Sequence, residues 1–331
     1  MAKSIVICYD GTNNEFGVNN TNVVKLFRRV LGADHNQVAF YDPGVGTFNP
    51  FKPNAFLRPV KVAGNLMGNA FGWGLKANLE DGYRYLMNTY EKGDYVYLFG
   101  FSRGAYTARA LGGMLAYFGL LEKGNDNLVG YVSKYYVNKK FDRARGFKET
   151  FCRPCTPYFV GVWDTVASLD YFGYQRFYDA QLKKGVKYGY QAVSIDEKRS
   201  KFMPNLWDES NVHEHQVIEQ VWFPGVHSDV GGGYAEQGLS DIALIWMLDK
   251  AQGCGLKLKK DWRKQLSPDP GSTIHKSYNW KWWLLGKKVR RIPEGGLVHQ
   301  SVVDRKEKDG SYRPELPSGY RVVSNASYQD Y

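Results

Sequence analysis

Short apolar runs bounded by turn residues recur along the chain, and helical patterns fall between several of them. Runs of this kind are typical of buried parallel strands. The five clearest runs are Ser4–Tyr9, Gln37–Tyr41, Tyr95–Phe99, Tyr158–Trp163 and Val217–Phe223. The helical patterns cover residues 22–31, 75–90 and 105–118. Because strands alternate with helices, the sequence predicts an α/β fold with a mostly parallel, doubly wound sheet and helices on both faces.

Two segments interrupt this alternation. Residues 48–74 mix Phe, Pro, Asn and Gly with little charge, and they are long enough to form an insertion or lid. Residues 256–331 are basic and rich in loops, and from about Asp304 the sequence indicates a surface tail or a late strand pair. No clear linker divides the chain, so we expect residues 1–331 to form a single elaborated domain. Its core would cover residues from about 4 to about 250.

Composition and charge narrow the function classes. The chain of 331 residues is 43% hydrophobic and 23% charged, which is ordinary for a globular protein, and its formal net charge is +11. No apolar run reaches the 18 residues of a membrane span, and the N-terminal run is too short for a secretory signal. The sequence therefore predicts synthesis in the cytoplasm. Peripheral membrane binding, or export by a route that needs no signal peptide, fits these features equally well.

The cysteines do not indicate a metal site or a disulfide framework. Cys8, Cys152, Cys155 and Cys254 are few and scattered, and the C-x-x-C of Cys152 and Cys155 has no second pair to complete a zinc site. We therefore predict no metal and no cofactor.

The pentapeptide Gly100-Phe101-Ser102-Arg103-Gly104 is the strongest chemical signal in the sequence. This G-x-S-x-G pattern directly follows an apolar strand and directly precedes a helical pattern, which is the context of a nucleophile elbow. The small residues allow a sharp turn that exposes the serine, and the helix N-terminus points N–H groups at charge that develops there. We predict that Ser102 is a nucleophile.

A nucleophilic serine needs a base, and on this scaffold the base follows an acid that itself follows the serine. His227 lies after the run Val217–Phe223 and before a glycine-rich loop, where sheet proteins of this class place catalytic groups. His299 is the alternative base. For the acid we choose Asp164, at the end of Tyr158–Trp163, although it could merely cap the next helix. Asp229 is a rival acid, or a group that supports the site or binds a metal.

The first predicted strand ends in Asp10-Gly11-Thr12. A glycine turn at the carboxyl end of a strand can present backbone N–H groups, so Gly11 and Thr12 are candidates for an oxyanion hole together with the N–H of Arg103. Asp10 would support this site from the side. The alternative is an ordinary Asp-Gly turn.

Five ordered motifs resemble those of one family, the uncharacterised α/β-hydrolase domain found in type VI secretion phospholipase effectors. The motifs are Asp10–Thr12, Gly44–Thr47, Gly100–Arg109, Gly161–Val166 and Phe223–Tyr234. The resemblance runs from about residue 4 to about residue 250. It implies an α/β-hydrolase fold and a Ser-Asp-His triad, which maps onto Ser102, Asp164 and His227. The family's characterised effectors hydrolyse phospholipids, so a phospholipid or membrane-surface substrate, an antibacterial role, and a secretion or immunity partner are implied as well.

Three functions remain open on the sequence. The first is a serine hydrolase that cleaves phospholipid esters through an acyl-enzyme. The second keeps that chemistry on a small soluble ester or thioester. The third is a catalytically silent basic binding module, although no nucleic-acid motif is present and we expect no nucleic-acid partner.

A cluster of aromatic and basic residues in the C-terminal region bears on the first function. Tryptophan rings favour the head-group interface of a bilayer, and lysines favour acidic lipid. The cluster consists of Trp280, Lys281, Trp282, Trp283, Lys287 and Lys288. We expect it to dock the enzyme on anionic bilayers; in the alternative, these rings belong to the core.

Overall fold

A single parallel sheet organises the protein. The computed structural model describes residues 2–11, 17–44, 60–166, 181–279, 282 and 286–324, with the side chains of the long helix α2 described from residue 74 onward. Within these residues eight strands form one sheet in the order β10–β9–β8–β7–β6–β3–β1–β2, and each neighbouring pair is parallel. The strands are β1 Ser4–Tyr9, β2 Gln37–Asp42, β3 Tyr95–Phe101, β6 Phe159–Trp163, β7 Tyr188–Ser194, β8 Val217–Phe223, β9 Leu297–His299 and β10 Arg321–Val323. The five predicted strands are confirmed, with small differences at their ends.

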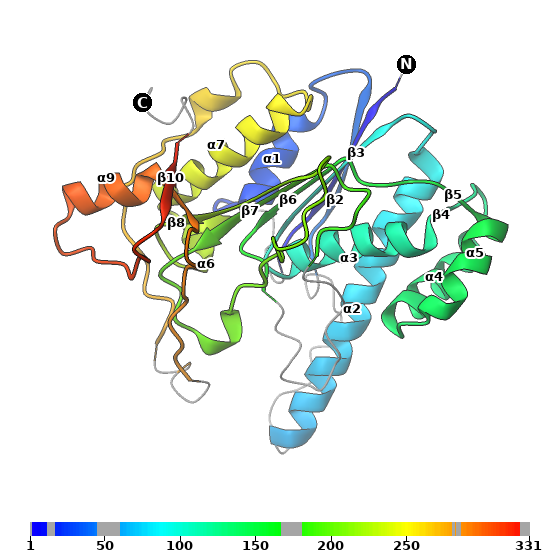
Figure 1. The fold of residues 1–331 in the computed structure, drawn as a ribbon, viewed down its shortest axis with the longest axis horizontal. Helices are drawn as coiled ribbons and strands as arrows, with labels where there is room; N and C mark the ends of the chain where they lie inside the picture. Colours follow the sequence, from blue (N-terminus) through cyan, green and yellow to red (C-terminus); the bar gives the residue numbers. More distant parts are fainter. Residues whose placement is uncertain are drawn as a thin grey trace.

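Helices cover both faces of this sheet (Figure 1). The helices are α1 Asn22–Val30, α2 Val60–Thr89, α3 Arg103–Phe118, α4 Asp126–Val137, α5 Ala144–Phe151, α6 His227–Gly231, α7 Gly238–Gly253 and α9 Gln300–Lys308. Shorter elements are β4 Leu120–Leu121, which pairs antiparallel with β5 Cys152–Arg153, and the 3₁₀ turns η1 Phe141–Arg143, η3 Ser200–Phe202 and η4 Trp262–Gln265. The fold class predicted from the sequence is therefore correct.

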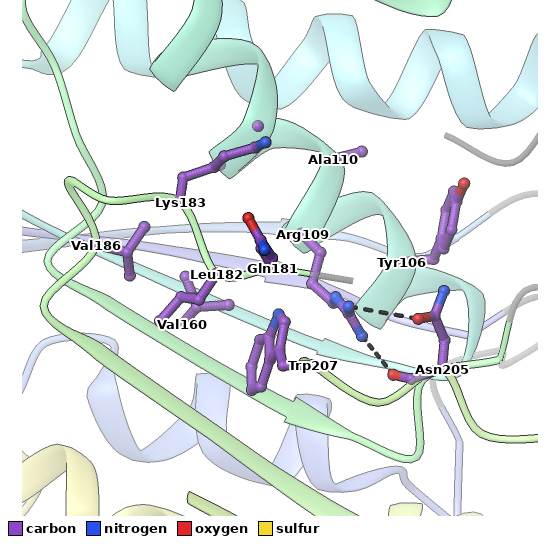
Figure 2. Close-up of a pocket in the computed structure, with 12 residues that line it drawn as sticks. Tyr106, Arg109, Ala110, Val160, Gln181, Leu182, Lys183, Val186, Asn205 and Trp207 are labelled. Atoms are coloured by element: carbon purple, nitrogen blue, oxygen red, sulfur yellow. Dashed lines mark hydrogen bonds between the residues drawn. The ribbon is translucent and has the colours of Figure 1, made fainter. Parts of the chain in front are cut away.

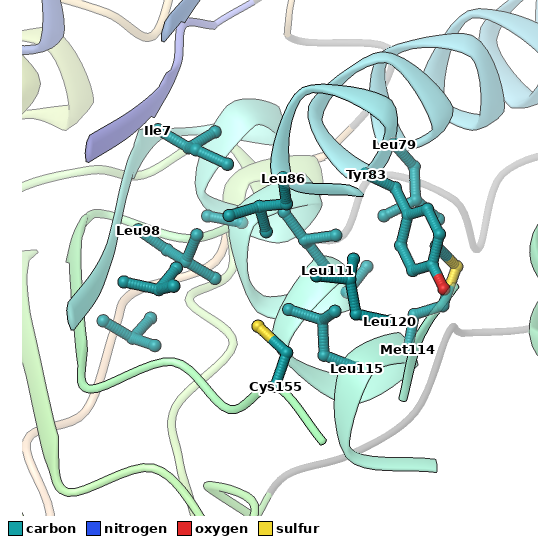
Figure 3. Packing of buried hydrophobic residues seen from close by; sticks show 14 of the residues in the cluster. Ile7, Leu79, Tyr83, Leu86, Leu98, Leu111, Met114, Leu115, Leu120 and Cys155 are labelled. Atoms are coloured by element: carbon teal, nitrogen blue, oxygen red, sulfur yellow. The ribbon is translucent and has the colours of Figure 1, made fainter. Parts of the chain in front are cut away.

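The alternation of side chains along β1 explains why both faces are covered. Ile5 and Ile7 lie in a core with α2, α3 and α4, whereas Val6 and Cys8 lie in a second core with α1 and α7. A strand that is apolar on both faces must be covered on both faces. Figure 3 shows part of the first core, where Leu111 of α3 lies beside Leu86 of α2, and Leu115 of α3 lies beside Leu120 and Cys155.

Two segments that interrupt the predicted alternation carry more regular structure than the sequence indicates. Residues 60–74 of the predicted insertion form the first half of α2, while residues 48–59 lie outside the described residues. The C-terminal region contributes β9, α9 and β10, and β9 pairs with β8 at the edge of the main sheet. Of the stretch from Asp304, the first residues belong to α9, and β10 pairs with β9 as a late strand at the edge of the main sheet. Residues 325–331 lie outside the described residues.

The strand order reverses direction beside β1. The chain runs from β1 to β2 on one side of β1, and then returns to β3 on the other side. Such a reversal is the topological switch point at which α/β proteins bind ligands, beyond the carboxyl ends of the strands. The turns after β1 and β3 meet at this point. The described helices include none long and apolar enough to cross a bilayer.

Candidate active site

The turn after β3 has the backbone of a nucleophile elbow. Ser102 sits between β3 and α3 with φ 59° and ψ −120°, which is a conformation that non-glycine residues rarely adopt. Its N–H donates to the carbonyl of Trp163 at the end of β6, at 3.0 Å. A strained residue of this kind persists only where its surroundings fix it, and such residues cluster at active sites. The backbone of Ser102 is thus of the kind found at active sites.

Gly104 lets the elbow approach β1 closely. A Cβ atom at this position would lie 2.2 Å from the carbonyl oxygen of Tyr9 and 2.4 Å from that of Asp10. These are backbone atoms, so they cannot move without disturbing the strand. Only glycine therefore allows α3 to begin against the end of β1.

We predict that Gly104→Ala destabilises the protein by about 2–3 kcal/mol, because the added methyl group overlaps main-chain atoms. Gly112→Ala is the matched control on the same helix, since its Cβ would meet Pro157 and Leu98 at 3.7 Å and 3.9 Å, which are ordinary contacts. Because alanine is the better helix former, the control should be neutral or slightly stabilising. Urea unfolding measures both changes. Equal midpoints for the two variants would contradict the close approach at Gly104.

His227 connects the serine to a buried acid. It opens the short helix α6 after β8, and its side chain lies between two partners. Nε2 lies 2.8 Å from Oγ of Ser102, and Nδ1 lies 2.5 Å from Oδ2 of Asp164. Since an ionised carboxylate can only accept, Nδ1 carries the proton and Nε2 accepts from the serine hydroxyl. The structure thus brings Ser102, His227 and Asp164 together in the order that a charge-stabilised base requires.

Asp164 is held rigidly at the end of β6. It has φ 42°, its N–H donates to the carbonyl of Ala192 at 2.7 Å, and its side chain is fully buried. Oδ1 accepts the N–H of Ser194 at 2.9 Å, and two nitrogens of Arg290 approach the two carboxylate oxygens at 2.6 and 3.0 Å. The carboxylate is therefore oriented by β7 and by the segment before β9.

The surroundings set the charge of both groups. Burial alone would raise the pKa of Asp164, but the Arg290 charge and the hydrogen bond from His227 outweigh it, so this pKa lies well below its usual range. Burial lowers the pKa of His227; Asp164 opposes this effect, while Arg290 and Arg199 add to it. At neutral pH the pair is therefore a carboxylate and a neutral imidazole, which is the resting state of a general base.

Glu197 fixes the backbone of the base. It is buried, and its carboxylate accepts the N–H of His227 at 3.3 Å and forms two side-chain hydrogen bonds with Arg199. Ser277 donates to the same carboxylate at 2.9 Å. Neither Glu197 nor Arg290 was identified from the sequence. Each acts through residues that are distant in the chain, and neither lies in a recognisable motif.

Asp229 supports the base from the other side. Its Oδ2 accepts the N–H of Val226 at 2.9 Å and that of His275 at 3.1 Å, while Oδ1 lies 2.6 Å from Nδ1 of His275. Asp229 therefore holds the start of α6, on which His227 lies. The rival interpretation of Asp229 as the acid does not fit, because the carboxylate that contacts His227 belongs to Asp164.

The three predicted oxyanion donors differ in what the structure shows of them. The N–H of Gly11 donates to the Asp10 carboxylate at 2.7 Å, which uses the donor that an oxyanion would need. The Asp10 carboxylate also accepts from Thr21 and Tyr41, and the role of Gly11 as an oxyanion donor stays a prediction. Thr12 lies outside the described residues. Arg103 is the first residue of α3, and its role as an oxyanion donor remains a prediction.

The alternative base occupies a different place. His299 is fully buried at the end of β9, where its Nδ1 lies 2.9 Å from Oγ of Ser301 and caps α9. Its ring stacks on Phe223 with the centroids 4.6 Å apart. These contacts tie His299 to α9 and β8 and give it a structural role, whereas Oγ of Ser102 contacts His227.

The cysteines and the remaining acidic groups do not form a metal site within the described residues, where no three potential ligands converge. Cys155 packs in the core, and burial raises its pKa to about 12. Burial also raises the pKa of Cys152 to about 11. Both thiols are therefore protonated at neutral pH.

A separate small pocket lies along α3 (Figure 2). Arg109 projects into it, donates to the carbonyl of Asn205 at 2.5 Å and lies over the ring of Trp207 at 4.8 Å. Burial lowers the pKa of Arg109 to about 10 and that of Lys183 to about 8. No member of the Ser–His–Asp constellation is among the described residues that line this pocket.

The chain is similar to several known proteins. The family model described as "T6SS, Phospholipase effector Tle1-like, catalytic domain" matches residues 3–250, about three quarters of the chain. The uncharacterized protein YEL023C of Saccharomyces cerevisiae is 33% identical over 217 residues, which cover 60% of this chain and 32% of that protein.

Two solved structures are also similar. One is an uncharacterized protein from Pseudomonas aeruginosa, with 22% identity and a TM-score of 0.48 over 81% of this chain and 49% of that one. The other is the Tle1 effector bound to the VgrG spike of the type 6 secretion system, with 17% identity and a TM-score of 0.41 over 71% of this chain and 52% of that one. The chain thus spans about a third of the yeast relative and about half of each structural neighbour.

Proposed function

We propose that this chain, which belongs to the Tle1-like catalytic-domain family of type VI secretion phospholipase effectors, is a serine hydrolase that cleaves carboxylic ester bonds of phospholipids. The observation that carries the proposal is the continuous set of contacts from Ser102 through His227 to Asp164 at a strained elbow. Family membership supports a phospholipase, and these contacts support an acyl-enzyme mechanism for it.

The proposed reaction has two stages. Oγ of Ser102 attacks the ester carbonyl while Nε2 of His227 accepts the hydroxyl proton, and Asp164 stabilises the imidazolium that forms. The N–H of Arg103 stabilises the oxyanion. His227 then protonates the departing alcohol, which leaves an acyl group on Ser102. Water, deprotonated by His227, cleaves this acyl-enzyme and releases a fatty acid.

Exposed cations lie beside the site. They support the proposal that the enzyme meets its substrate at an anionic lipid surface. Residues 198–200 run alongside residues 286–288, because the N–H of Lys288 donates to the carbonyl of Lys198 at 2.9 Å and Ser200 pairs with Gly286. We call the exposed cations that this pairing gathers the basic rim. They are Lys198, Lys287, Lys288 and Arg291.

Aromatic rings link the basic rim to the base. The ring of Phe202 lies 5.0 Å from that of His227 and 5.4 Å from that of Trp282, and Arg199 lies 3.5 Å from the Phe202 ring centroid. Trp282 is half-buried; Trp280, Lys281 and Trp283 lie outside the described residues. The predicted membrane role of the tryptophan cluster therefore rests here on Trp282 and on the rim lysines.

The function is tested by labelling with a fluorophosphonate and by product analysis on three substrates: anionic phosphatidylglycerol vesicles, neutral phosphatidylcholine vesicles and a soluble butyrate ester. We expect labelling, release of fatty acid from the vesicles, and faster release from the anionic ones. Hydrolysis of the soluble ester alone would replace the phospholipid with a small ester or thioester. A chain that neither labels nor hydrolyses would be a silent binding module.

We predict that Lys287→Gln with Lys288→Gln weakens binding to anionic vesicles roughly 30-fold at low salt, since each cation near such a surface contributes about 1 kcal/mol. Hydrolysis of the soluble ester should not change. The matched control is Lys259→Gln with Lys260→Gln, two exposed lysines outside the rim. Vesicle sedimentation measures the binding. Equal losses in both double variants would show that net charge, not the basic rim, attracts the lipid.

Export through a type VI secretion system, an antibacterial role, and a secretion or immunity partner remain proposals that follow from the family. Synthesis in the cytoplasm, with later export or peripheral membrane binding, has the same standing.

A further inference from the structure

Arg290 reaches the catalytic carboxylate from the C-terminal region, 40 residues beyond the end of the family match. Its side chain is fully buried. Nη1 donates to Oδ1 of Asp164 at 2.6 Å and to the carbonyl of Ser194 at 2.8 Å, while Nη2 donates to Oδ2 of Asp164 at 3.0 Å and to the carbonyl of Phe202. The guanidinium therefore forms a two-pronged contact with the acid and is fixed by the backbone on both sides.

This contact changes the electrostatics of the triad. A fully buried carboxylate without a nearby cation costs several kcal/mol, and it tends to take up a proton instead. Asp164 accepts five hydrogen bonds from His227, Arg290 and Ser194. Only Arg290 brings a permanent charge to this set, because a guanidinium does not lose its proton in proteins.

We propose that Arg290 is a positioning residue of the triad: it keeps Asp164 ionised and oriented toward Nδ1 of His227, and it limits protonation of His227 in mildly acidic solution. This inference rests on the proposed function. It also assigns the segment before β9 to the catalytic unit, although that segment lies outside the family match.

The charges around His227 decide in which direction the loss of Arg290 shifts its protonation. Asp164 and Glu197 favour its protonated form, while Arg290 and Arg199 disfavour it; Ser102 is neutral, and the nearby rings of Phe101 and Phe202 carry no charge. Burial acts in the same direction as the two arginines. Removing Arg290 leaves the negative charge of Asp164 uncompensated, so His227 protonates more easily. If Asp164 takes up a proton instead, the base loses its orienting acceptor. In both cases activity is lost at a higher pH than in the wild type.

The experiment measures kcat and KM for a soluble butyrate ester between pH 4.5 and 9 in the full chain. The variants are Arg290→Gln, which removes the charge, and Arg290→Lys, which keeps it without the two-pronged geometry. Arg305→Gln is the matched control: Arg305 is also a buried arginine of the C-terminal region, but it donates to the carbonyls of Pro270 and Ser272.

For Arg290→Gln we expect the acid limb of kcat/KM to move up by about one pH unit, which is the size of effect that a nearby charge exerts. KM should not change, because Arg290 lies behind the acid. Arg290→Lys should keep the acid limb of the wild type but lose roughly tenfold in kcat. Arg305→Gln should lower stability without moving the limb.

An unchanged acid limb in Arg290→Gln, with a loss of stability like that of the control, would overturn the inference. If Arg290→Gln does not fold, Arg290→Lys decides: wild-type kcat in that variant would overturn the positioning role, and a tenfold loss at constant KM would support it. A wild-type chain without Ser102-dependent esterase activity would instead refute the proposed function, so the two failures are distinguishable.

Discussion

Ser102→Ala is expected to lower kcat for ester hydrolysis by roughly 10⁴-fold or more, because the acyl-enzyme cannot form without the hydroxyl. The variant should also lose all labelling by a fluorophosphonate. Ser102 is 8% exposed, and its hydroxyl is hydrogen-bonded to the imidazole of His227. Because this bond serves the reaction rather than the packing of the core, removing one hydroxyl should leave the fold intact. Initial rates on a soluble ester and a thermal melt measure the two quantities.

The control for this prediction is Ser228→Ala. Ser228 directly follows His227 in α6, so it tests whether any serine near the base reacts. It should keep its labelling and most of its activity. Turnover within tenfold of the wild type in a folded Ser102→Ala protein would contradict the assignment of the nucleophile and, with it, the acyl-enzyme mechanism.

The parts of the fold that the sequence predicts are those with a local signal. β1 and β3 are almost continuously apolar, and β8 ends in the apolar residues Val221, Trp222 and Phe223; all three are strands in the structure. β7 lacks this signal because Gly189 and Gln191 interrupt its apolar residues. Gln191 is nevertheless buried, because its side-chain amide donates a hydrogen bond to Gln220 and accepts one from Thr165. A buried strand with paired polar side chains cannot be recognised from hydropathy alone.

The same distinction applies to the site. Ser102, Asp164 and His227 each follow an apolar strand, so a rule about the carboxyl ends of parallel strands is enough to bring them to one edge of the sheet. Arg290 has no such signal. It lies in a segment without regular structure and contacts Asp164 across 126 residues of chain. Its place depends on how β9 joins β8, which the short run at residues 297–299 does not reveal.

The prediction for Gly11 depends on a local contact. An aspartate before a glycine readily accepts a hydrogen bond from the following backbone, and Asp10 does so. The sequence Asp10-Gly11 fits both an oxyanion donor and an ordinary turn. The two interpretations differ only in where the N–H of Gly11 points. Side-chain geometry was needed to separate them.

His227→Ala is expected to lower kcat about as much as Ser102→Ala, because residues of a triad act as a unit. Without the imidazole, nothing accepts the proton from Ser102, and Asp164 loses its contact with the reacting atoms. KM for the soluble ester should change little. His299→Ala should keep kcat within tenfold of the wild type. It should instead cost about 2–3 kcal/mol of stability, since the substitution removes a helix cap and a buried stacked ring.

The two histidines therefore separate activity from stability. His227 lies 2.8 Å from the nucleophile, whereas His299 holds the start of α9. Rates measured on folded protein and urea unfolding of both variants show whether each residue contributes to catalysis or to stability. A severe loss of kcat in folded His299→Ala, with near-normal turnover in His227→Ala, would make His299 the base. The contact between His227 and Ser102 would then have to break before catalysis, because one hydroxyl proton cannot be transferred to two bases.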